Sequence, residues 1–286
     1  MFYLTGDIHG DVKKIVEFSK NNNLTDKDTI IILGDAGLNF YCNKTDDKLK
    51  RVLNKLGPKI FCIHGNHEIR PETIKTYNIT EYCGGRVYVE TQYSNILFAI
   101  DGEVYNFDGN QVLVCGGAYS VDKWYRIYRT IERHSDKIPK ELYSDRMLCL
   151  AHSYIFGVSV PNKGELLNWM TEVYNSLPNS VKFWWDNEQP SELTKQHVEN
   201  QLGKNNWTVD VVLTHTCPFD FEPVDMFISG IDQDSVDDST EKWLQEIERK
   251  LNYKHWYAGH FHIDRKVNDK FTLMFNDFIK LDTKDE

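Results

Sequence analysis

The chain has 286 residues, 41% of them hydrophobic and 13% aromatic, so it can bury a large core, and its length alone would allow about two domains. It has 33 lysines and arginines against 43 aspartates and glutamates, and the net charge of −10 argues against nonspecific binding to DNA or to an anionic membrane. Because no apolar run approaches the roughly 18 residues of a membrane span, we expect no membrane-spanning segment.

Strands and helices alternate through the first third of the chain. Short apolar runs over 1–5, 29–33 and 59–63 predict strands. The segments 11–22 and 44–56 have helical periodicity, and they lie between these strands. The first third therefore has the pattern of consecutive βαβ units.

The pattern changes between Arg86 and Cys115, where short strand runs follow one another. Asp101-Gly102 and Asp108-Gly109 separate these runs, and Asp-Gly is a hairpin signal, so we predict an antiparallel meander. Later helices are expected over 121–135, 163–176, 191–203 and 239–251, and later strands near 209–213, 254–258 and 271–275. Asp238 lies three residues before Glu241, which predicts a capping box at the start of the last helix.

Five short blocks along the chain contain Asp, Asn or His, mostly next to a glycine. They are Gly6-Asp7-Ile8-His9-Gly10, Gly34-Asp35-Ala36-Gly37, Gly65-Asn66-His67-Glu68, Thr214-His215-Thr216 and Gly259-His260-Phe261-His262. Each block but the last directly follows a run with the pattern of a buried strand. We therefore expect these side chains on loops at a shared rim of the fold, where active sites form.

The residue types in these blocks suit a pair of divalent cations. Two such cations about 3.5–4 Å apart repel each other, so their site needs a bridging carboxylate, for which we choose Asp35. Neutral imidazoles and an amide oxygen complete the ligand shells. In Asp7-Ile8-His9 and His260-Phe261-His262 the i, i+2 spacing on extended backbone points both side chains of each pair to one side. The blocks together predict a two-metal hydrolytic site.

Block for block, the chain resembles the calcineurin-like metallophosphoesterase superfamily over residues 7 to 262, and more loosely its stand-alone bacterial and phage members. The resemblance implies an α/β fold, a four-layer αββα sandwich of two mixed sheets with a partly helical insertion. It implies that one metal is held by Asp7, His9, Asp35 and His262, and the other by Asp35, Asn66, His215 and His260. His67 would lie next to the leaving group, so the residues that carry catalysis would be His67 and Asp35.

Ligands from Asp7 to His262 have to converge on one site. We therefore expect residues 1–286 to form a single catalytic domain with an insertion, a cap-like region, over 116–203. In this region Arg126 is a candidate to clamp phosphate oxygens, and Trp184 or Trp185 to form a wall of the pocket. Packing roles for the same three residues are an equal alternative.

The second block departs from one branch of the superfamily. Phosphoprotein phosphatases continue it as Gly-Asp-x-Val-Asp-Arg-Gly, whereas this chain has Gly34-Asp35-Ala36-Gly37-Leu38-Asn39-Phe40. Their clamp arginine is therefore absent at that position. Arg70 and Arg126 are the candidates to replace it.

The resemblance implies a two-metal-dependent phosphoester hydrolase in which a hydroxide that bridges the metals attacks phosphorus and His67 protonates the departing alkoxide. Our leading hypothesis is a phosphomonoesterase, a phosphatase acting on a phosphorylated small molecule or protein. A phosphodiesterase or nuclease is the alternative, although the net charge disfavours nucleic acid. A non-catalytic scaffold is the third hypothesis. Ligands without thiolate suit manganese, which we name first, and also iron, zinc, nickel or cobalt.

The remaining cysteines and histidines predict no second site. Six cysteines without a Cys-x-x-Cys pair are typical of reduced, mostly buried thiols in a cytoplasmic protein, and the N-terminus lacks the pattern of a signal peptide. Structural roles are expected for the histidines outside the blocks, with His152 the least secure of the five: His64, His134, His152, His197 and His255. The natural substrate and the oligomeric state do not follow from the sequence.

Overall fold

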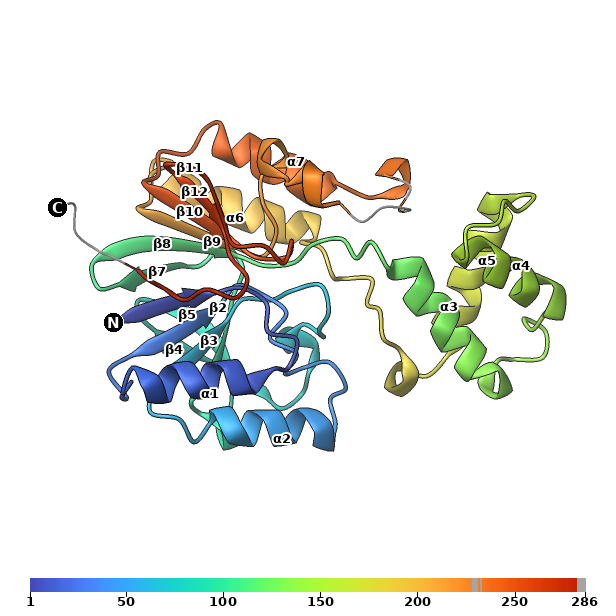
Figure 1. Ribbon diagram of the computed structural model, residues 1–286, viewed down its shortest axis with the longest axis horizontal. Helices are drawn as coiled ribbons and strands as arrows, with labels where there is room; N and C mark the ends of the chain where they lie inside the picture. Colours follow the sequence, from blue (N-terminus) through green and yellow to red (C-terminus); the bar gives the residue numbers. More distant parts are fainter. Residues whose placement is uncertain (228–230, 232, 282–286) are drawn as a thin grey trace. The chain divides into compact units, whose positions relative to one another are not determined.

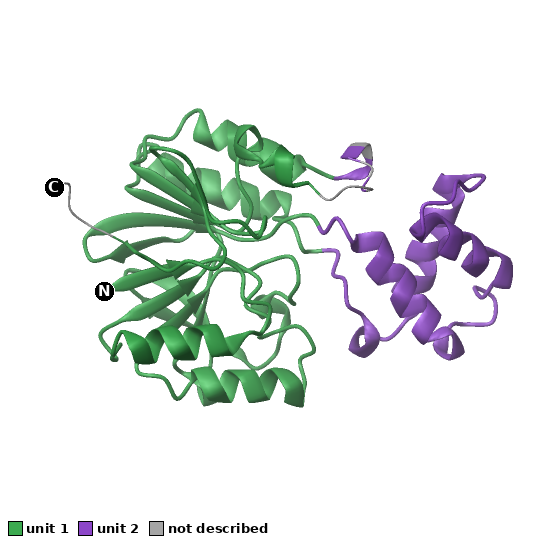
Figure 2. Ribbon diagram, in the orientation of Figure 1, with its two compact units in different colours: residues 1–119, 187–227, 237–286 green, residues 120–186, 228–236 purple. Residues whose placement is uncertain are grey.

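The chain divides into two compact units in the computed structural model, which describes residues 1–227, 231 and 233–281. The first unit comprises Met1–Tyr119, Asn187–Phe227 and Asp237–Glu286, and the second comprises Ser120–Asp186 and Ile228–Val236 (Figure 2). Most of the second unit falls inside the predicted 116–203 region. That the whole chain acts as a single catalytic domain stays a prediction.

The first sheet lies in the first unit. Over the described residues it has seven strands in the order β13-β1-β2-β3-β6-β5-β4. In that order their bounds are Ile279–Lys280, Phe2–Thr5, Thr29–Ile32, Lys59–Cys62, Ile96–Ala99, Gly85–Glu90 and Tyr77–Tyr82. Strands β1, β2, β3 and β6 run parallel, and the strands outside them pair antiparallel. The inner strands are buried on both faces, which explains the continuous apolar run of β2.

The second sheet, also in the first unit, repeats this plan. Within the described part of the chain it has six strands in the order β11-β12-β10-β9-β8-β7. In that order their bounds are Arg265–Asn268, Phe271–Leu273, His255–Ala258, Val211–Thr214, Asn110–Cys115 and Val104–Phe107. Strands β12, β10, β9 and β8 are parallel, and β11 and β7 are antiparallel edges. Both sheets are therefore mixed.

Helices cover the outer face of each sheet (Figure 1). Helices α1 (Val12–Asn21) and α2 (Lys44–Leu53) pack on the first sheet, and α6 (Glu192–Lys204) and α7 (Ser239–Glu248) on the second. The second unit holds α3 (Lys123–Arg133), α4 (Asp145–Ile155) and α5 (Lys163–Ser176) around an apolar core of their own. Short 3₁₀ turns lie at Pro71–Thr73, Thr91–Tyr93, Ser135–Lys137, Asn179–Val181, Phe219–Phe221, Val224–Met226 and Gln233–Ser235.

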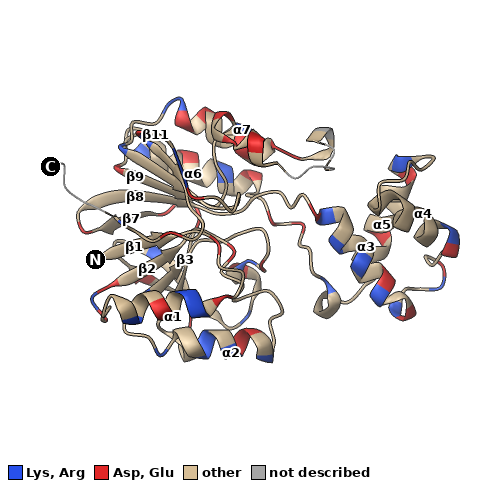
Figure 3. Ribbon diagram, in the orientation of Figure 1, with Lys and Arg blue, Asp and Glu red and all other residues tan. Residues whose placement is uncertain are grey.

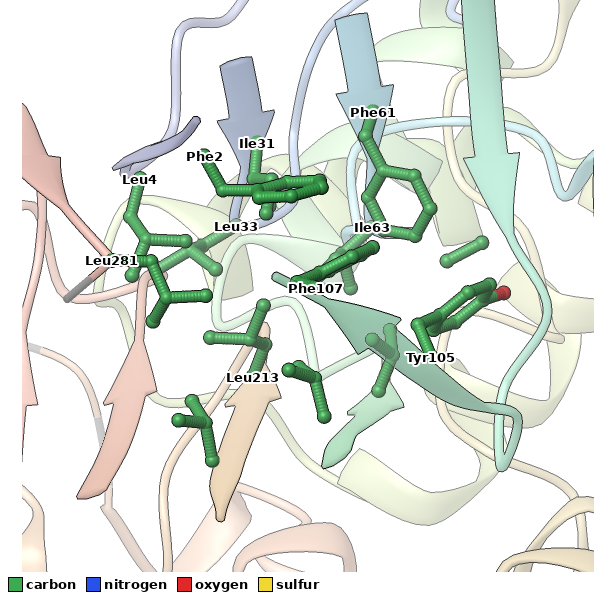
Figure 4. Packing of buried hydrophobic residues seen from close by; sticks show 14 of the residues in the cluster. Phe2, Leu4, Ile31, Leu33, Phe61, Ile63, Tyr105, Phe107, Leu213 and Leu281 are labelled. Atoms are coloured by element: carbon green, nitrogen blue, oxygen red, sulfur yellow. The ribbon is translucent and has the colours of Figure 1, made fainter. Parts of the chain in front are cut away.

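The two sheets meet face to face through a core of large apolar side chains (Figure 4). The rings of Phe2 and Phe107 stack with their centroids 4.4 Å apart, and Phe61 meets Phe107 edge to face at 5.4 Å. Separate apolar clusters join each sheet to its helices. The predicted fold class, an α/β sandwich with αββα layers and two mixed sheets, is confirmed.

Three details of the sequence prediction are wrong. The strands from Arg86 to Cys115 do not form one meander, because β6 belongs to the first sheet and β7 to the second. Asp101-Gly102 is therefore the crossover between sheets, whereas Asp108-Gly109 does join an antiparallel pair, with both residues at positive φ. Asp238 is at the N-cap of α7 but its side chain makes no capping hydrogen bond, and an oxygen of the Glu241 side chain accepts a hydrogen bond from Thr216. Helix α4 and strands β4, β11 and β13 were not predicted.

Among the described residues, the structure contains no helix whose length and apolar character would let it cross a membrane.

Candidate metal centre

The five sequence blocks lie on loops that follow parallel strands of the two sheets. Asp7 and His9 follow β1, Asp35 follows β2, and Asn66 and His67 follow β3. On the second sheet, His215 follows β9, and His260 and His262 follow β10. Because parallel strands present their carboxyl ends at one edge, the strand order places these loops at a common rim.

Asp7 is almost fully buried, and one of its two carboxylate oxygens has no hydrogen-bond partner among the described residues. Its Oδ1 accepts a hydrogen bond from the backbone N–H of His260 at 2.9 Å, whereas its buried Oδ2 has no hydrogen-bond partner among the described residues. The Nε2 atom of His262 lies 3.4 Å from Oδ2, and that of His9 lies 3.8 Å away. Burial opposes ionisation of Asp7, but His215 and His262 outweigh it and hold the pKa well below its usual range. An ionised carboxylate oxygen thus faces imidazoles in a buried site.

Asp35 lies between two groups of imidazoles. Its Oδ1 accepts a hydrogen bond from the backbone N–H of His67 at 2.8 Å. Its Oδ2 is 3.9 Å from Nδ1 of His9 and 3.8 Å from Nε2 of His215. Burial raises the pKa of Asp35, and the nearby charge of Asp7 adds to that effect. Two buried carboxylates in one site need positive charge nearby. Divalent cations would supply that charge, and Asp35 is placed where it could contact two of them.

The ring of His215 is held in one orientation. Its Nδ1 lies 2.9 Å from the carbonyl oxygen of Leu33, which can only accept, so Nδ1 carries a proton and donates. The Nε2 atom of the same ring lies 2.7 Å from the side-chain oxygen of Asn66. The ring of His260 meets the His215 ring with centroids 5.0 Å apart, and burial lowers the pKa of His260 to about 3. Burial thus favours the neutral form of His260, the form in which an imidazole binds metals.

The rings of His9, His67 and His262 complete the cluster. The Nε2 atoms of His9 and His262 are 2.8 Å apart, and the His9 and His67 ring centroids are 5.5 Å apart. Among the described residues, ligand atoms within 4.8 Å of one another form the groups Asp7, His9 and His262; His9, Asp35 and His67; and Asp7, Asp35 and His215. Carboxylates and imidazoles in overlapping groups, with the unpartnered Asp7 Oδ2 among them, fit divalent metal ions.

Several of these residues have left-handed backbone, so the extended backbone expected for Asp7-Ile8-His9 and His260-Phe261-His262 is wrong. His9, Asp35, His260 and His262 all have positive φ, between 43° and 68°, a region that residues other than glycine rarely adopt. Such strain persists at functional sites where the surroundings fix the conformation. Gly34, at φ +102°, is required for a second reason, since a Cβ atom there would lie 1.9 Å from Nδ1 of His215.

Glu68 is a buried residue of the third block to which the sequence assigned no role. One of its carboxylate oxygens accepts a weak hydrogen bond from the backbone N–H of Gly65 at 3.4 Å, and burial raises its pKa to about 8. It braces the loop that carries Asn66 and His67. The sequence did contain one signal for Glu68, its position directly after the candidate site residues Asn66 and His67, because a buried charged residue there needs a partner.

The residues predicted to contact substrate lie in different places. Arg70, in the first unit, is buried and paired with Asp101, with Nη1 2.7 Å from Oδ2. Arg126 lies in the second unit, on helix α3, where lysines and arginines are frequent (Figure 3), and its guanidinium lies 5.6 Å from the ring centre of Trp185. Trp184 is buried in the core of the second unit, so packing is one of its roles. Contact of these four residues with substrate stays a prediction.

Residues 1–176 match the calcineurin-like phosphoesterase family. The chain belongs to this family. It is therefore a metal-dependent phosphoesterase, and the resemblance inferred from the sequence blocks is confirmed. The cluster described above supplies candidate ligands for the divalent metals of a calcineurin-like phosphoesterase.

No curated protein matches the chain, whereas several solved structures do, among them the following two. A phosphopantetheinyl hydrolase from Mycobacterium tuberculosis is 14% identical, with a TM-score of 0.42, over 96% of this chain and 87% of that chain. A protein of unknown function from Aquifex aeolicus is 20% identical, with a TM-score of 0.18, over 32% of this chain and 59% of that one.

Proposed function

We propose that this calcineurin-like phosphoesterase is a phosphomonoesterase that uses two divalent metals. The observation that supports the metals in this proposal is the buried Asp7 Oδ2, which has no hydrogen-bond partner in the described chain and lies within 4 Å of two imidazole nitrogens. Such an oxygen is costly to bury unless a cation binds it. In our assignment one metal is held by Asp7, His9, Asp35 and His262, and the other by Asp35, Asn66, His215 and His260.

When bound, the two cations would supply Lewis acidity, which ionises water near neutral pH and offsets the charge of the phosphoryl oxygens. The chain's own residues then have separate tasks. Asp35 spans the two ligand groups and fixes their spacing, and its Oδ1 orders the backbone at His67. His67 donates a proton to the departing alkoxide, a role that geometry near His9 and Asp35 supports.

Manganese is the metal that we propose first, with iron, zinc, nickel and cobalt as rivals. The candidate ligands are carboxylate, amide and imidazole, and the described cysteines are all free and absent from the ligand groups. This ligand set does not select strongly among the divalent transition metals. The six free cysteines also support our expectation of a reducing, cytoplasmic environment.

The proposed substrate is a phosphate monoester of a small molecule or a protein side chain. The test is the hydrolysis of an aryl phosphate monoester and the matched diester by metal-stripped protein to which manganese, nickel, zinc or magnesium is restored. Preference for the monoester is the expected result. Preference for the diester would replace the proposal with a phosphodiesterase, and no metal-dependent turnover on either would favour a scaffold.

Two variants separate the roles of the residues. Asp35→Asn should lose metal and activity together, because the bridging charge is gone. His67→Ala should keep both metals and lose about 10²–10⁴-fold in turnover on a poor leaving group, the usual contribution of a general acid. A nitrophenyl ester, whose leaving group needs no proton, is the internal control, and equal losses on both esters would contradict the role of His67.

A further inference from the structure

The loop that directly follows β12, residues 274–277, lies against the candidate metal ligands. Its first backbone N–H donates a hydrogen bond to the last carbonyl oxygen of β10 at 2.7 Å, so the loop starts where the two parallel strands end. It then passes close to Gly6, the residue before Asp7. A Cβ atom at Gly6 would lie 2.6 Å from the Cα atom of Phe275. The loop contains no candidate ligand, and the sequence assigned it no role.

The ring of Phe275 stacks on the imidazole of His262. Their centroids are 4.8 Å apart, with 24° between the ring planes. In this orientation the Nε2 atom of His262 lies 3.4 Å from Oδ2 of Asp7 and 2.8 Å from Nε2 of His9. Half of the His262 side chain is exposed, whereas the Asp7 side chain is fully buried. Exposed side chains change rotamer readily, so His262 needs a neighbour that holds its ring.

The carboxylate of Asp264, two residues after His262, fastens the loop. Its Oδ1 accepts hydrogen bonds from the backbone N–H groups of Phe275 at 2.7 Å and Asp277 at 3.2 Å, and its Oδ2 accepts one from Asn276 at 2.9 Å. Three successive N–H groups thus converge on one side chain, and hydrogen bonds to a carboxylate are stronger than those between neutral groups. Asp264 is itself exposed, so its replacement creates no buried gap.

The carbonyl oxygen of Phe275 is held as well. Lys14 of α1 donates to it from Nζ at 2.5 Å, and Thr5, the last residue of β1, donates from Oγ1 at 3.3 Å. The Lys14 Nζ atom also lies 5.7 Å from the ring centre of Phe275 and 5.4 Å from that of Phe278. With its N–H bound by Asp264 and its carbonyl bound by Lys14 and Thr5, Phe275 has a fixed backbone. The direction of its ring toward His262 follows from that backbone.

We propose that Phe275 and Asp264 are positioning residues for His262. Asp264 fixes the loop, the loop fixes the Phe275 ring, and the ring holds the imidazole of His262 with its Nε2 toward Asp7. The inference rests on the proposed function in one respect, that His262 is a metal ligand, and it does not depend on the choice between monoester and diester. Residues that orient metal ligands typically contribute about 10–100-fold in metal affinity.

The test is a manganese titration of metal-stripped protein, in which the electron paramagnetic resonance signal of free Mn²⁺ gives the number of bound ions and their dissociation constants. Phe275→Leu removes the ring and keeps an apolar side chain, whereas Phe275→Tyr keeps the ring. We expect one of two ions to bind about tenfold more weakly in Phe275→Leu, and both to bind with wild-type affinity in Phe275→Tyr. Thermal unfolding checks that each variant is folded.

Phe278→Leu is the matched control. It removes a ring at a similar distance from Lys14 Nζ, but Phe278 stacks on Phe18, with centroids 3.7 Å apart, and has no ring contact with His262 among the described residues. Phe278→Leu should bind both ions like the wild type. Equal affinities in Phe275→Leu and Phe278→Leu would overturn the proposal, whether they match the wild type or fall below it.

A double variant tests whether Asp264 acts through Phe275. Asp264→Ala should weaken the same ion by a similar factor, whereas Asp277→Ala, which removes a carboxylate from the same loop and keeps the backbone bond to Asp264, should not. Asp264→Ala combined with Phe275→Leu should bind no more weakly than Phe275→Leu alone, because both changes remove one support. Losses that multiply would refute the role of Asp264. A wild-type protein that binds no manganese would instead refute the metal centre itself.

Discussion

Replacing Gly34 by alanine should move His215 and so dismantle the metal centre. The new Cβ would lie 1.9 Å from Nδ1 of His215, and a tolerable contact needs about 3 Å, so the ring has to retreat by about 1 Å. That movement breaks the 2.9 Å hydrogen bond to Leu33, a loss of about 1 kcal/mol, and a displacement of this size at a catalytic group costs on the order of 10²-fold in rate. Backbone strain at φ +102° adds about 1–3 kcal/mol of lost stability.

Gly109 is a matched control for this substitution. Its φ of +98° imposes the same backbone strain on alanine, but nothing lies within 4 Å of the new Cβ, and it is in the turn at the other end of β8 from the ligand loops. Urea unfolding should therefore show similar losses of stability, with about 1 kcal/mol more for Gly34→Ala. Calorimetric metal titration and aryl phosphate hydrolysis should be impaired only in Gly34→Ala. A Gly34→Ala protein that binds metals and turns over like Gly109→Ala would refute the role of His215.

Three further predictions concern charge. Burial raises the pKa of Glu241 to about 7 from 4.5, so the stability that its neutral form contributes is fully present below about pH 4.5 and is lost as pH rises through 7. Glu241→Gln keeps an acceptor for Thr216 and cannot ionise. In urea unfolding it should therefore be as stable as wild type near pH 4.5 and more stable by up to about 3 kcal/mol at pH 8. Glu90→Gln should lower the free energy of unfolding by about 3–5 kcal/mol, because the buried Lys50 ammonium, 2.5 Å from a Glu90 oxygen, loses its counter-charge. The control is Asp269→Asn, which removes one partner of an exposed ion pair and should leave the free energy of unfolding unchanged. Chelation should lower the thermal midpoint, since metal at 100 times its dissociation constant contributes about 2.7 kcal/mol, and an unchanged midpoint would argue against bound metal.

The sequence predicted the layers and the candidate ligands because both are encoded locally. The strands that lead to the candidate ligands are continuous apolar runs, such as Thr29–Ile32, and most of the candidate ligands follow them directly beside glycines. Gly34 shows why such a pattern is informative, because a side chain there would occupy the space of the His215 ring. A residue type required by close packing can be recognised without knowing the packing partner.

Features that depend on distant partners were not predicted. The Asp-Gly pair at 101–102 has the same local pattern as the true hairpin at 108–109, and only the alignment of β6 with β3 places the crossover there. His64 was expected to be a structural residue, and only the folded structure shows that it is buried with both ring nitrogens lacking hydrogen-bond partners among the described residues. The antiparallel edge β4 is largely exposed and the edge β13 has only two residues, so no apolar period indicated them.

The hydrogen bond from His260 to Asp7 joins residues 253 positions apart. Next to it, β1 pairs with β13, with Tyr3 opposite Lys280. During translation the first strands emerge early, yet Asp7, His9 and Asp35 meet their imidazole partners only after residue 262 has left the ribosome. Metals bound by the candidate ligands would close a loop of almost the whole chain, which is where a cross-link restricts the unfolded state most.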